Sequence, residues 1–341
     1  MKEVGAELGL DVSIIHTGQH YDQNMANVFF EQFQLLPDVF LETSSKSPKA
    51  RIGKILQELI LCFEAMKPDV VVVPGDVDST LAGAIAANKL GIPLAHLESG
   101  LRSGDRTMPE EINRILTDEI SDFCFVTEQS GLDHLNKEKK AESAVFMVGN
   151  TMIDTMVKFD AEIRESNIGE QLAIEGEDFV LLTFHRPALV DTRDGLEEVV
   201  EILDRIPQKK VLPLHPRTRK NLEAFGMLKG WEDREDLILV EPMGYFDFQY
   251  LILHAKWVLT DSGGIQEETT FRQVPCITLR PNTERPSTIE VGTNRLVYPN
   301  DKKALYQAID DMNAGKFPKG SIPDLWDGKA TERVLKILLD V

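Results

Sequence analysis

The stretch WVLTDSGGIQEE, residues 257–268, joins a short apolar run to a helical pattern through a turn that contains two glycines. Glycine has no Cβ, so the backbone at Gly263 and Gly264 can approach a ligand closely. The first N–H groups of a helix have no partner inside the helix and carry partial positive charge. A strand, a glycine turn and a helix start in this order favour an anion site, most often one for phosphate. A plain Ser-Gly turn without a ligand is the alternative for this segment alone.

The same alternation of apolar runs and helical patterns continues along the chain and predicts the fold. The runs are rich in β-branched residues and apolar on both faces, which is typical of parallel strands covered by helices on both sides. Repeated units of this kind predict an α/β fold of doubly wound, Rossmann-like domains. The strands are expected at residues 12–17, 70–74, 93–98, 123–127 and 145–149, and then at 179–184, 210–215, 237–242, 257–261, 276–280 and 295–298.

The chain is long enough for two domains. A polar stretch at residues 163–177 separates the two series of strands, and 341 residues can bury two cores. We therefore predict a first Rossmann-like domain over residues 1–165 and a second over 166–325, with a cleft between them. A final helix over 326–341 is expected to pack back on the first domain.

Charge and composition argue against several kinds of partner. The net charge of −19 repels nucleic-acid phosphates and anionic lipids, so we expect neither nucleic acid nor a membrane as a partner. The cysteines Cys62, Cys124 and Cys276 are far apart and lie in apolar runs, which favours buried thiols in a reducing compartment. The sequence shows no metal-ligand spacing, no apolar run near the ~18 residues that span a membrane, and no signal-peptide pattern. These features predict a cytoplasmic protein without a bound metal.

Two stretches that follow strands of the first series carry carboxylates: PGDVDST at 74–80 and HLESGLRSGDRTMPEEINR at 96–114. The carboxyl ends of parallel strands meet at one edge of a sheet, so Asp76, Glu98 and Glu110 are expected to face one crevice. Glu110 and Arg114 are four apart on the predicted helix and share a face. An N-capping Asp76 and a solvated ion pair are the simpler interpretations. Clustered acids, however, shift each other's pKa values as general acid–base chemistry requires.

The second series places positive groups after its strands. His185 and Arg186 lie in TFHRPALVD, His215 and Arg217 in PLHPRTRKN, and Arg285 in LRPNTERP. A single histidine is more often structural, but a strand-end position beside an arginine favours a phosphate or a reacting proton. Phosphate-binding groups in one domain and acid–base groups in the other would suit a sugar nucleotide.

These motifs, taken together, resemble those of a known family. TDSGGIQEE, HLESGLRSGD with MPEEINR, PGDVDST, FHR and TERP are similar to the motifs of the non-hydrolysing UDP-N-acetylglucosamine 2-epimerases, over residues 12–298. That family has the two-domain GT-B fold. The resemblance implies an isomerase that interconverts UDP-GlcNAc and UDP-ManNAc without a cofactor or metal. It also implies a homodimer that serves surface polysaccharide biosynthesis.

The resemblance further implies a mechanism and a set of site residues. A base removes the C2 proton while UDP leaves C1, 2-acetamidoglucal stays in the site, and UDP adds back after reprotonation on the other face. The implied catalytic residues are Asp76, Glu98, Glu110, Arg114 and His185. The predicted substrate-binding residues are Ser262, Gly263, Gly264, the ribose-binding Glu268, His20, Arg186, His215, Arg217 and Arg285.

The start of the chain departs from the family pattern. Family members begin with a β-strand and a loop that reads roughly Gly-Thr-Arg-Pro-Glu and faces the nucleotide phosphates. This sequence begins inside a helical pattern that runs into the predicted strand at 12–17. The comparison with the family pattern therefore predicts that the first strand and its loop are absent, and that a chain extended by them would be more stable and more active.

Three other activities fit the same motifs. A hydrolysing 2-epimerase would release ManNAc and UDP, and a relative could act on a UDP-diacetamido uronic acid. A GT-B glycosyltransferase would need an acceptor. A protein that only binds sugar nucleotides would bind UDP without exchanging the C2 proton.

Overall fold

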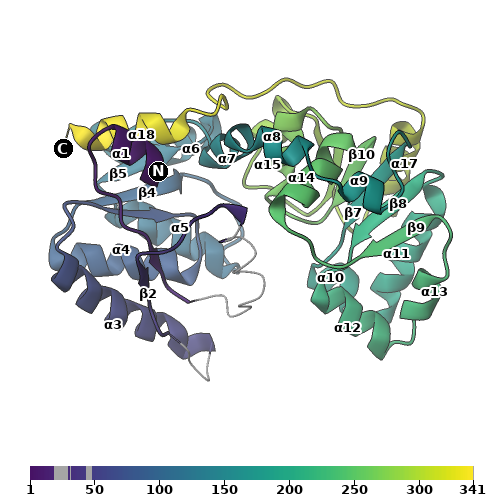
Figure 1. Cartoon of the computed structure of the whole chain (residues 1–341), viewed down its shortest axis with the longest axis horizontal. Helices are drawn as coiled ribbons and strands as arrows, with labels where there is room; N and C mark the ends of the chain where they lie inside the picture. The colour runs from purple at the N-terminus through teal and green to yellow at the C-terminus, as the bar shows by residue number, and fades with distance from the viewer. Residues whose placement is uncertain (19–29, 31, 44–47, 341) are drawn as a thin grey trace. The chain divides into compact units, whose positions relative to one another are not determined.

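The computed structural model describes all residues except 19–29, 31, 44–47 and 341. The chain forms two compact units (Figure 1), the first made of Met1–Val157 with Asp324–Val341 and the second of Lys158–Pro323. The boundary lies earlier than the predicted residue 165. The short helices α8 (Asp160–Arg164) and α9 (Ile168–Gln171) pack against α14 (Tyr245–His254), so they belong to the second unit.

The first unit is built on a parallel four-stranded sheet in the order β3-β4-β5-β6. A separate two-stranded parallel sheet joins β1 (Ile15–His16) to β2 (Val39–Phe40), and the sequence analysis did not predict β2. The strands of the larger sheet are β3 (Val71–Pro74), β4 (Leu94–Ser99), β5 (Phe123–Val126) and β6 (Val145–Met147). The helices are α1 (Lys2–Glu7), α3 (Pro48–Met66), α4 (Asp78–Leu90), α5 (Pro109–Ile120), α6 (Gln129–Lys137), α7 (Thr151–Lys158) and α18 (Ala330–Leu339), with a 3-10 turn at Glu142–Ala144.

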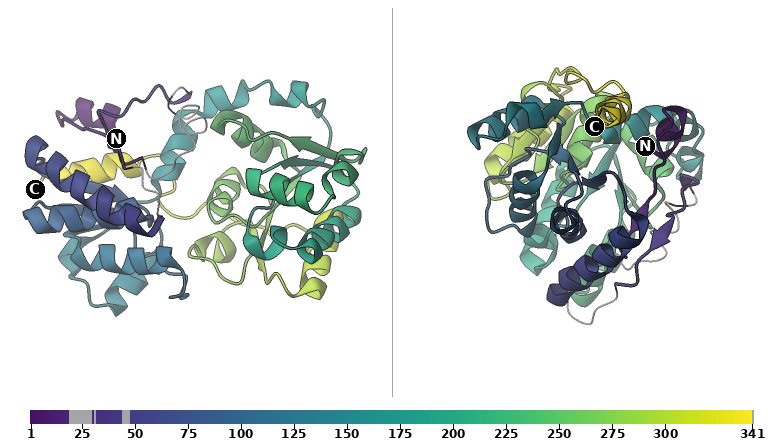
Figure 2. Two further views of the ribbon diagram at one scale, coloured as in Figure 1. Left: turned by 90° about the horizontal axis from the view of Figure 1, so that it is seen from below. Right: turned by 90° about the vertical axis from the view of Figure 1, so that its left-hand side faces the viewer.

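Both faces of this sheet are covered, as its apolar strands require. Apolar residues of α3 and α4 pack on one face against Val71, Val73 and Leu94. On the other face, Val334 and Leu338 of α18 pack against residues of β4 and β5. The C-terminal helix, yellow in Figures 1 and 2, lies beside the purple α1.

The second unit has one parallel six-stranded sheet in the order β12-β11-β10-β7-β8-β9. The chain starts at β7 in the middle, builds outward to β9 and returns on the other side of β7 at β10. Ligands of such sheets bind where the strand order reverses, which here is between β7 and β10. The strands are β7 (Phe179–Thr183), β8 (Lys209–Pro213), β9 (Leu237–Val240), β10 (Trp257–Thr260), β11 (Cys276–Leu279) and β12 (Asn294–Val297).

Helices cover both faces of this sheet as well, and two buried clusters fill the space between helices and strands. Local chemistry sets several helix starts: Thr192 accepts from the N–H of Gly195 at α11, and Pro109 occupies the first turn of α5 in the first unit. The remaining helices are α10 (Pro187–Val190), α11 (Arg193–Arg205), α12 (Pro216–Ala224), α13 (Leu228–Glu232), α15 (Ile265–Arg272), α16 (Ser287–Glu290) and α17 (Lys302–Asn313).

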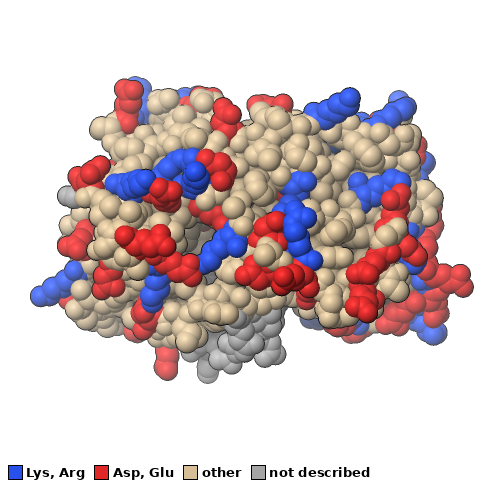
Figure 3. All heavy atoms as spheres, turned by 45° about the horizontal axis from the view of Figure 1, so that its top comes forward, with Lys and Arg blue, Asp and Glu red and all other residues tan. Residues whose placement is uncertain are grey.

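Each strand predicted from the sequence overlaps a strand in the structure, which confirms the Rossmann-like α/β fold. Acidic side chains are spread over the face seen in Figure 3, with basic side chains among them. Among the described residues, we found no helix with both the length and the apolar character needed to cross a bilayer.

The backbone of Gly100, which follows β4, packs closely against the backbone of Gly131. Its φ is 78°, and a Cβ there would lie 2.4 Å from the carbonyl oxygen of Gly131. Gly91 ends α4 with a φ of 66°, but a Cβ at that position would have no other atom within 4 Å. Both alanine variants should lose ~1 kcal/mol of unfolding free energy to the left-handed backbone. Gly100→Ala should lose a further ~1–3 kcal/mol, because the backbone must move.

Urea unfolding of the two variants, compared with the unchanged chain, checks this expectation. Equal losses of unfolding free energy in Gly91→Ala and Gly100→Ala would show that contact between the added methyl group and Gly131 does not destabilise the fold.

Candidate functional site

In the first unit, the turn after β3 places Asp76 at the carboxyl end of the sheet. Gly75 has a φ of 65°, so the chain turns sharply before α4 begins. The amide Nδ2 of Asn113 donates to the backbone oxygen of Asp76 at 2.9 Å, and Thr80 Oγ1 donates to the oxygen of Pro74 at 2.6 Å. The turn is therefore fixed both from α5 and from its own helix.

Glu98 has an unusual backbone conformation in the neighbouring strand. The pairing of β4 with β5 shifts register between Leu97 and Ser99, and the φ of Glu98 is 65°. A left-handed conformation is unfavourable for a residue with a side chain and persists only where the surroundings enforce it. Such strain is concentrated at functional sites. A register shift of this kind re-aims the side chain at the end of the strand.

A buried histidine and aspartate lie directly beneath these two turns. His96 is fully buried, and its Nδ1 lies 2.7 Å from Oδ1 of Asp118 while its Nε2 lies 2.8 Å from the carbonyl oxygen of Gly75. Asp118 Oδ2 also accepts from the N–H of Gly100 at 3.0 Å and lies 2.7 Å from Arg102 Nη1. Burial raises the pKa of Asp118, but His96 and Arg102 together hold that pKa below its usual value.

Arg114 links the Asp76 turn to the loop after β4. Its buried guanidinium forms an ion pair with Asp76 and a second one with Glu111, 3.1 Å away. Glu111 in turn accepts from the backbone N–H groups of Ser103 at 2.8 Å and of Gly104 at 3.0 Å. The predicted residues Asp76 and Arg114 are thus joined by an ion pair. Arg114 also reaches the loop after β4 through Glu111.

In the second unit, Asp261 organises the predicted His185–Arg186 turn. Its fully buried Oδ2 accepts from the backbone N–H groups of both residues at 2.8 Å. Its Oδ1 lies 2.8 Å from His185 Nδ1, and Arg186 Nε donates to its backbone oxygen at 2.8 Å. The His185 imidazole is therefore oriented by a carboxylate and remains 37% exposed.

His215 lies beside His185, with the ring centres 5.5 Å apart. Its Nδ1 accepts from the N–H of Arg217 at 3.1 Å and caps α12. Burial and the neighbouring His185 lower the pKa of His215. Arg217 itself pairs with Asp191, so its charge is already balanced within this unit.

The glycine turn after β10 packs against a buried arginine. A Cβ on Gly263 would lie 2.7 Å from Nη1 of Arg280. Arg280 is held by Glu284 through two hydrogen bonds, at 3.0 and 2.8 Å. Although burial raises the pKa of Glu284, Arg280 and Arg285 lower it to about 2. Arg285 also lies 2.5 Å from Glu267, so both arginines are neutralised by carboxylates.

With both arginines neutralised, the start of α15 is the remaining part of the turn with positive partial charge. The amide of Gln266 donates to the backbone oxygen of Gly263 at 3.1 Å and accepts from Thr283 at 2.8 Å. The turn of Ser262, Gly263 and Gly264 is thus fixed at the N-terminus of α15, where backbone N–H groups are unpaired within the helix.

Glu268 is buried in the first turn of the same helix. Burial, with the nearby Glu267, raises the pKa of Glu268 to about 8, although Gln249 and Arg272 oppose the shift. Its carboxyl group therefore holds a proton at neutral pH and can both donate and accept a hydrogen bond. The sequence predicted only a ribose-binding role for this side chain, since its burial near Tyr245 is a tertiary feature.

Of the predicted residues, Asp76, Glu98, Glu110 and Arg114 belong to the first unit, and those from His185 onward belong to the second. Glu110 is partly exposed in the first turn of α5, while Asp76, Glu98 and Arg114 lie at or beside the strand ends. His20 lies outside the described residues. The described part of the chain contains no cluster of three or more metal-ligating side chains.

Several residues that hold the predicted side chains in place were not predicted from the sequence. His96, Glu111, Asp118 and Asp261 lie inside or next to the quoted motifs, yet their partners are 3 to 76 residues away in the sequence. Their only signal was a polar residue within a motif or a buried strand. Their roles depend on contacts that no local pattern reveals.

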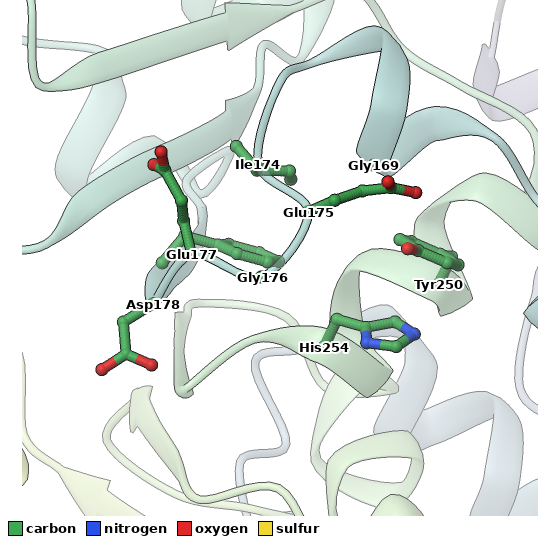
Figure 4. Close-up of a pocket in the computed structure, with 9 residues that line it drawn as sticks. Gly169, Ile174, Glu175, Gly176, Glu177, Asp178, Tyr250 and His254 are labelled. Carbon is green, nitrogen blue, oxygen red and sulfur yellow. The ribbon is translucent and has the colours of Figure 1, made fainter.

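A separate pocket of about 250 Å³ lies at the other end of β7 in the second unit (Figure 4). Its lining includes the acids Glu175, Glu177 and Asp178, with Tyr250 and His254 from α14. None of the lining residues belongs to the predicted site. An acidic lining repels phosphate, so this pocket is a poor match for a nucleotide diphosphate.

The raised pKa of Glu268 predicts how stability depends on pH. Between about pH 4.5 and 8 the folded chain keeps a proton that the unfolded chain releases, so unfolding free energy should fall as pH rises through this range. Glu268→Gln removes this contribution and should flatten the dependence. Melting temperatures across this range, with the exposed Glu235→Gln as a control, would check it. Parallel curves for Glu268→Gln and the unchanged chain would contradict the assignment.

Comparison with known proteins gives a consistent result. Residues 2–339 match a family model described as UDP-N-acetylglucosamine 2-epimerase. A protein of that name from Methanocaldococcus jannaschii is 41% identical over 342 residues, which cover 96% of this chain and 91% of the relative. A UDP-2,3-diacetamido-2,3-dideoxy-D-glucuronate 2-epimerase from Pseudomonas aeruginosa is 40% identical over 290 residues, covering 83% of this chain and 79% of the relative.

A solved structure shows the same overall fold. The crystal structure of M. jannaschii UDP-GlcNAc 2-epimerase in complex with UDP-GlcNAc and UDP matches with a TM-score of 0.88 and 40% identity. The match covers 99% of this chain and 94% of that one. With its two Rossmann-like units of the GT-B fold, the chain belongs to the UDP-N-acetylglucosamine 2-epimerase family.

Proposed function

We propose that this protein interconverts UDP-GlcNAc and UDP-ManNAc by eliminating UDP and adding it back after the configuration at C2 has changed. The observation that carries the proposal is the strained Glu98 beside the Asp76–Arg114 ion pair, in a member of this family. Carboxylates fixed at strand ends can move a proton at carbon, and the second unit offers a site for the leaving diphosphate. The M. jannaschii relative with UDP-GlcNAc and UDP bound supports this choice of substrate.

The second unit holds the nucleotide in this proposal. Unpaired N–H groups at the start of α15 bind the diphosphate, because their partial charge and the bare backbone of Gly263 favour a close anion. The protonated Glu268 forms a hydrogen bond with a ribose hydroxyl. His185, oriented by Asp261, donates toward the diphosphate and stabilises UDP as it departs.

The first unit carries the proton transfers. The C2 proton is not acidic, so its removal needs a positioned base and must be coupled to loss of the leaving group. Asp76, Glu98 and Glu110 supply the carboxylates, and Arg114 holds Asp76 in place. The C2–H and C1–O bonds break and a C1–C2 double bond forms, giving 2-acetamidoglucal and UDP. The reverse steps, with the proton delivered to the opposite face, give the epimer without net oxidation or reduction.

A second substrate remains a candidate because of one relative. The P. aeruginosa enzyme named for a diacetamido uronic acid substrate is nearly as similar to this chain as the M. jannaschii enzyme is. Both reactions change the configuration at C2 of a UDP-sugar, so they require the same site chemistry. They differ in the groups at C3 and C6 of the sugar. We also propose that the chain forms a homodimer, as the resemblance implies.

Proton NMR of the purified chain with UDP-GlcNAc in heavy water tests the proposed reaction. We expect the C2 proton signal to disappear and a manno anomeric signal to appear with UDP still attached, because elimination and re-addition exchange that proton with solvent. A parallel sample would contain the UDP-diacetamido uronic acid.

Each outcome has a distinct meaning. Free ManNAc would indicate a hydrolysing enzyme, and exchange only with the uronic acid would favour the second candidate. Binding of UDP without exchange of either sugar would contradict the epimerase proposal.

Gly263→Ala tests the diphosphate site. The added methyl group would meet Nη1 of Arg280, which Glu284 holds in place, so the turn must shift. An overpacking cost of ~1–3 kcal/mol corresponds to a UDP affinity about 5- to 150-fold weaker. Gly230→Ala, in the same unit with no atom within 4 Å of the new Cβ, is the matched control. Calorimetric titration with UDP would measure both, and unchanged affinity in Gly263→Ala would place the diphosphate elsewhere.

A further inference from the structure

The buried His96 ring joins two turns that the proposed reaction uses. Through Nε2 it contacts the carbonyl oxygen of Gly75, the residue before Asp76. Through Nδ1 it contacts Asp118, whose other oxygen accepts from the N–H of Gly100, two residues after Glu98. One continuous chain of hydrogen bonds therefore runs from the Asp76 turn to the Glu98 turn without reaching the surface.

The partners of His96 determine what each ring nitrogen does. A carbonyl oxygen can only accept a hydrogen bond, so Nε2 donates to Gly75 while Nδ1 pairs with Asp118. Arg102 is balanced between Asp118 and Glu138, at 2.7 Å from each. Every charged group of this cluster has a partner of opposite sign, as burial requires.

The same network explains how Glu98 keeps its strained backbone. The strain persists only if surrounding contacts enforce it. Ser99 Oγ donates to the backbone oxygen of His96 at 2.8 Å, and Asp118 fixes the N–H of Gly100 at 3.0 Å. The close approach of Gly100 to Gly131 blocks movement on the other side. Asp118 thus holds the His96 side chain before Glu98 and the Gly100 backbone after it.

We propose that His96 and Asp118 are positioning residues that hold the carboxylates of Asp76 and Glu98 in register for proton transfer at C2. This inference rests on the proposed epimerase function and assigns a role to two residues that do not themselves touch the substrate. Their loss should slow the chemical step, because a displacement of about 1 Å in a catalytic group can cost on the order of 100-fold in rate. Nucleotide binding, which belongs to the second unit, should be unaffected.

Two substitutions separate the two contacts of the ring. In His96→Asn the amide nitrogen takes the place of Nδ1, so it can donate to Asp118 but cannot reach Gly75. In His96→Gln the amide nitrogen takes the place of Nε2, so it can donate to Gly75 but not to Asp118. We expect both variants to lose on the order of 100-fold in kcat for C2 proton exchange, with KM and UDP affinity unchanged.

Asp118→Asn keeps the shape of the network but replaces one carboxylate oxygen with an NH2 group. Its amide can donate to Nδ1 of a neutral His96, while its oxygen still accepts from Gly100. This variant should lose less kcat than His96→Asn. In nitrogen-15 NMR, Nε2 of His96 should carry a hydrogen both in the unchanged chain and in Asp118→Asn, because its partner is the carbonyl oxygen of Gly75.

Asp154→Asn is the matched control for lost stability in the first unit. Asp154 accepts from the backbone N–H groups of Ala330 and Thr331 at the start of α18 and takes no part in the network. A lower melting temperature with unchanged kcat in this variant would show that reduced stability alone does not slow the reaction.

The outcomes distinguish this inference from the proposed function. A wild-type chain that exchanges no C2 proton overturns the proposed function and this inference with it. A wild-type chain that is active while His96→Asn and His96→Gln keep its kcat overturns the inference alone.

Discussion

A buried carboxylate at the carboxyl end of the sheet is the interaction on which each unit depends. Turns between a parallel strand and a helix leave backbone N–H groups that cannot be satisfied by the sheet. Asp118 accepts from Gly100 in the first unit, and Asp261 accepts from His185 and Arg186 in the second. In both units the same carboxylate also orients a histidine ring. The two sites therefore share one design: an anion buried under the turns fixes both the backbone and an imidazole.

The charges of the second unit show why a protein of net charge −19 can still bind a diphosphate. Arg280 and Arg285 stand close to Gly263, yet Glu284 and Glu267 neutralise them. What remains is the partial charge of the helix start, which is directed at the turn and independent of the global charge. The arginines then serve to fix the geometry of the turn, and the absence of a Cβ on Gly263 keeps the space beside them open.

The first unit uses a different balance of charge. Its carboxylates are clustered, but Arg114 bridges Asp76 and Glu111, and the His96–Asp118 pair lies beneath both turns. Ion pairs of this kind stabilise little when the cost of burial is included, and their value lies in the geometry that they enforce. That geometry includes the left-handed Glu98, which an isolated strand would not adopt. The family relationship and this local strain point to the same edge of the sheet.

The Rossmann-like α/β fold follows from the amino-acid sequence, because apolar strands covered on both faces and regularly alternating helices admit few other arrangements. The positions of the strand-end motifs, from TDSGGIQEE to PGDVDST, follow from it as well. In contrast, three features are visible only in the folded chain: Arg114 meets Asp76, His96 spans Gly75 and Asp118, and burial leaves Glu268 protonated. The same holds for the short strand β2 and for the boundary at Lys158, which follows from the packing of α8 and α9. Local patterns report propensity and periodicity, whereas these features depend on which distant side chains burial brings into contact and on the charge that each one meets there.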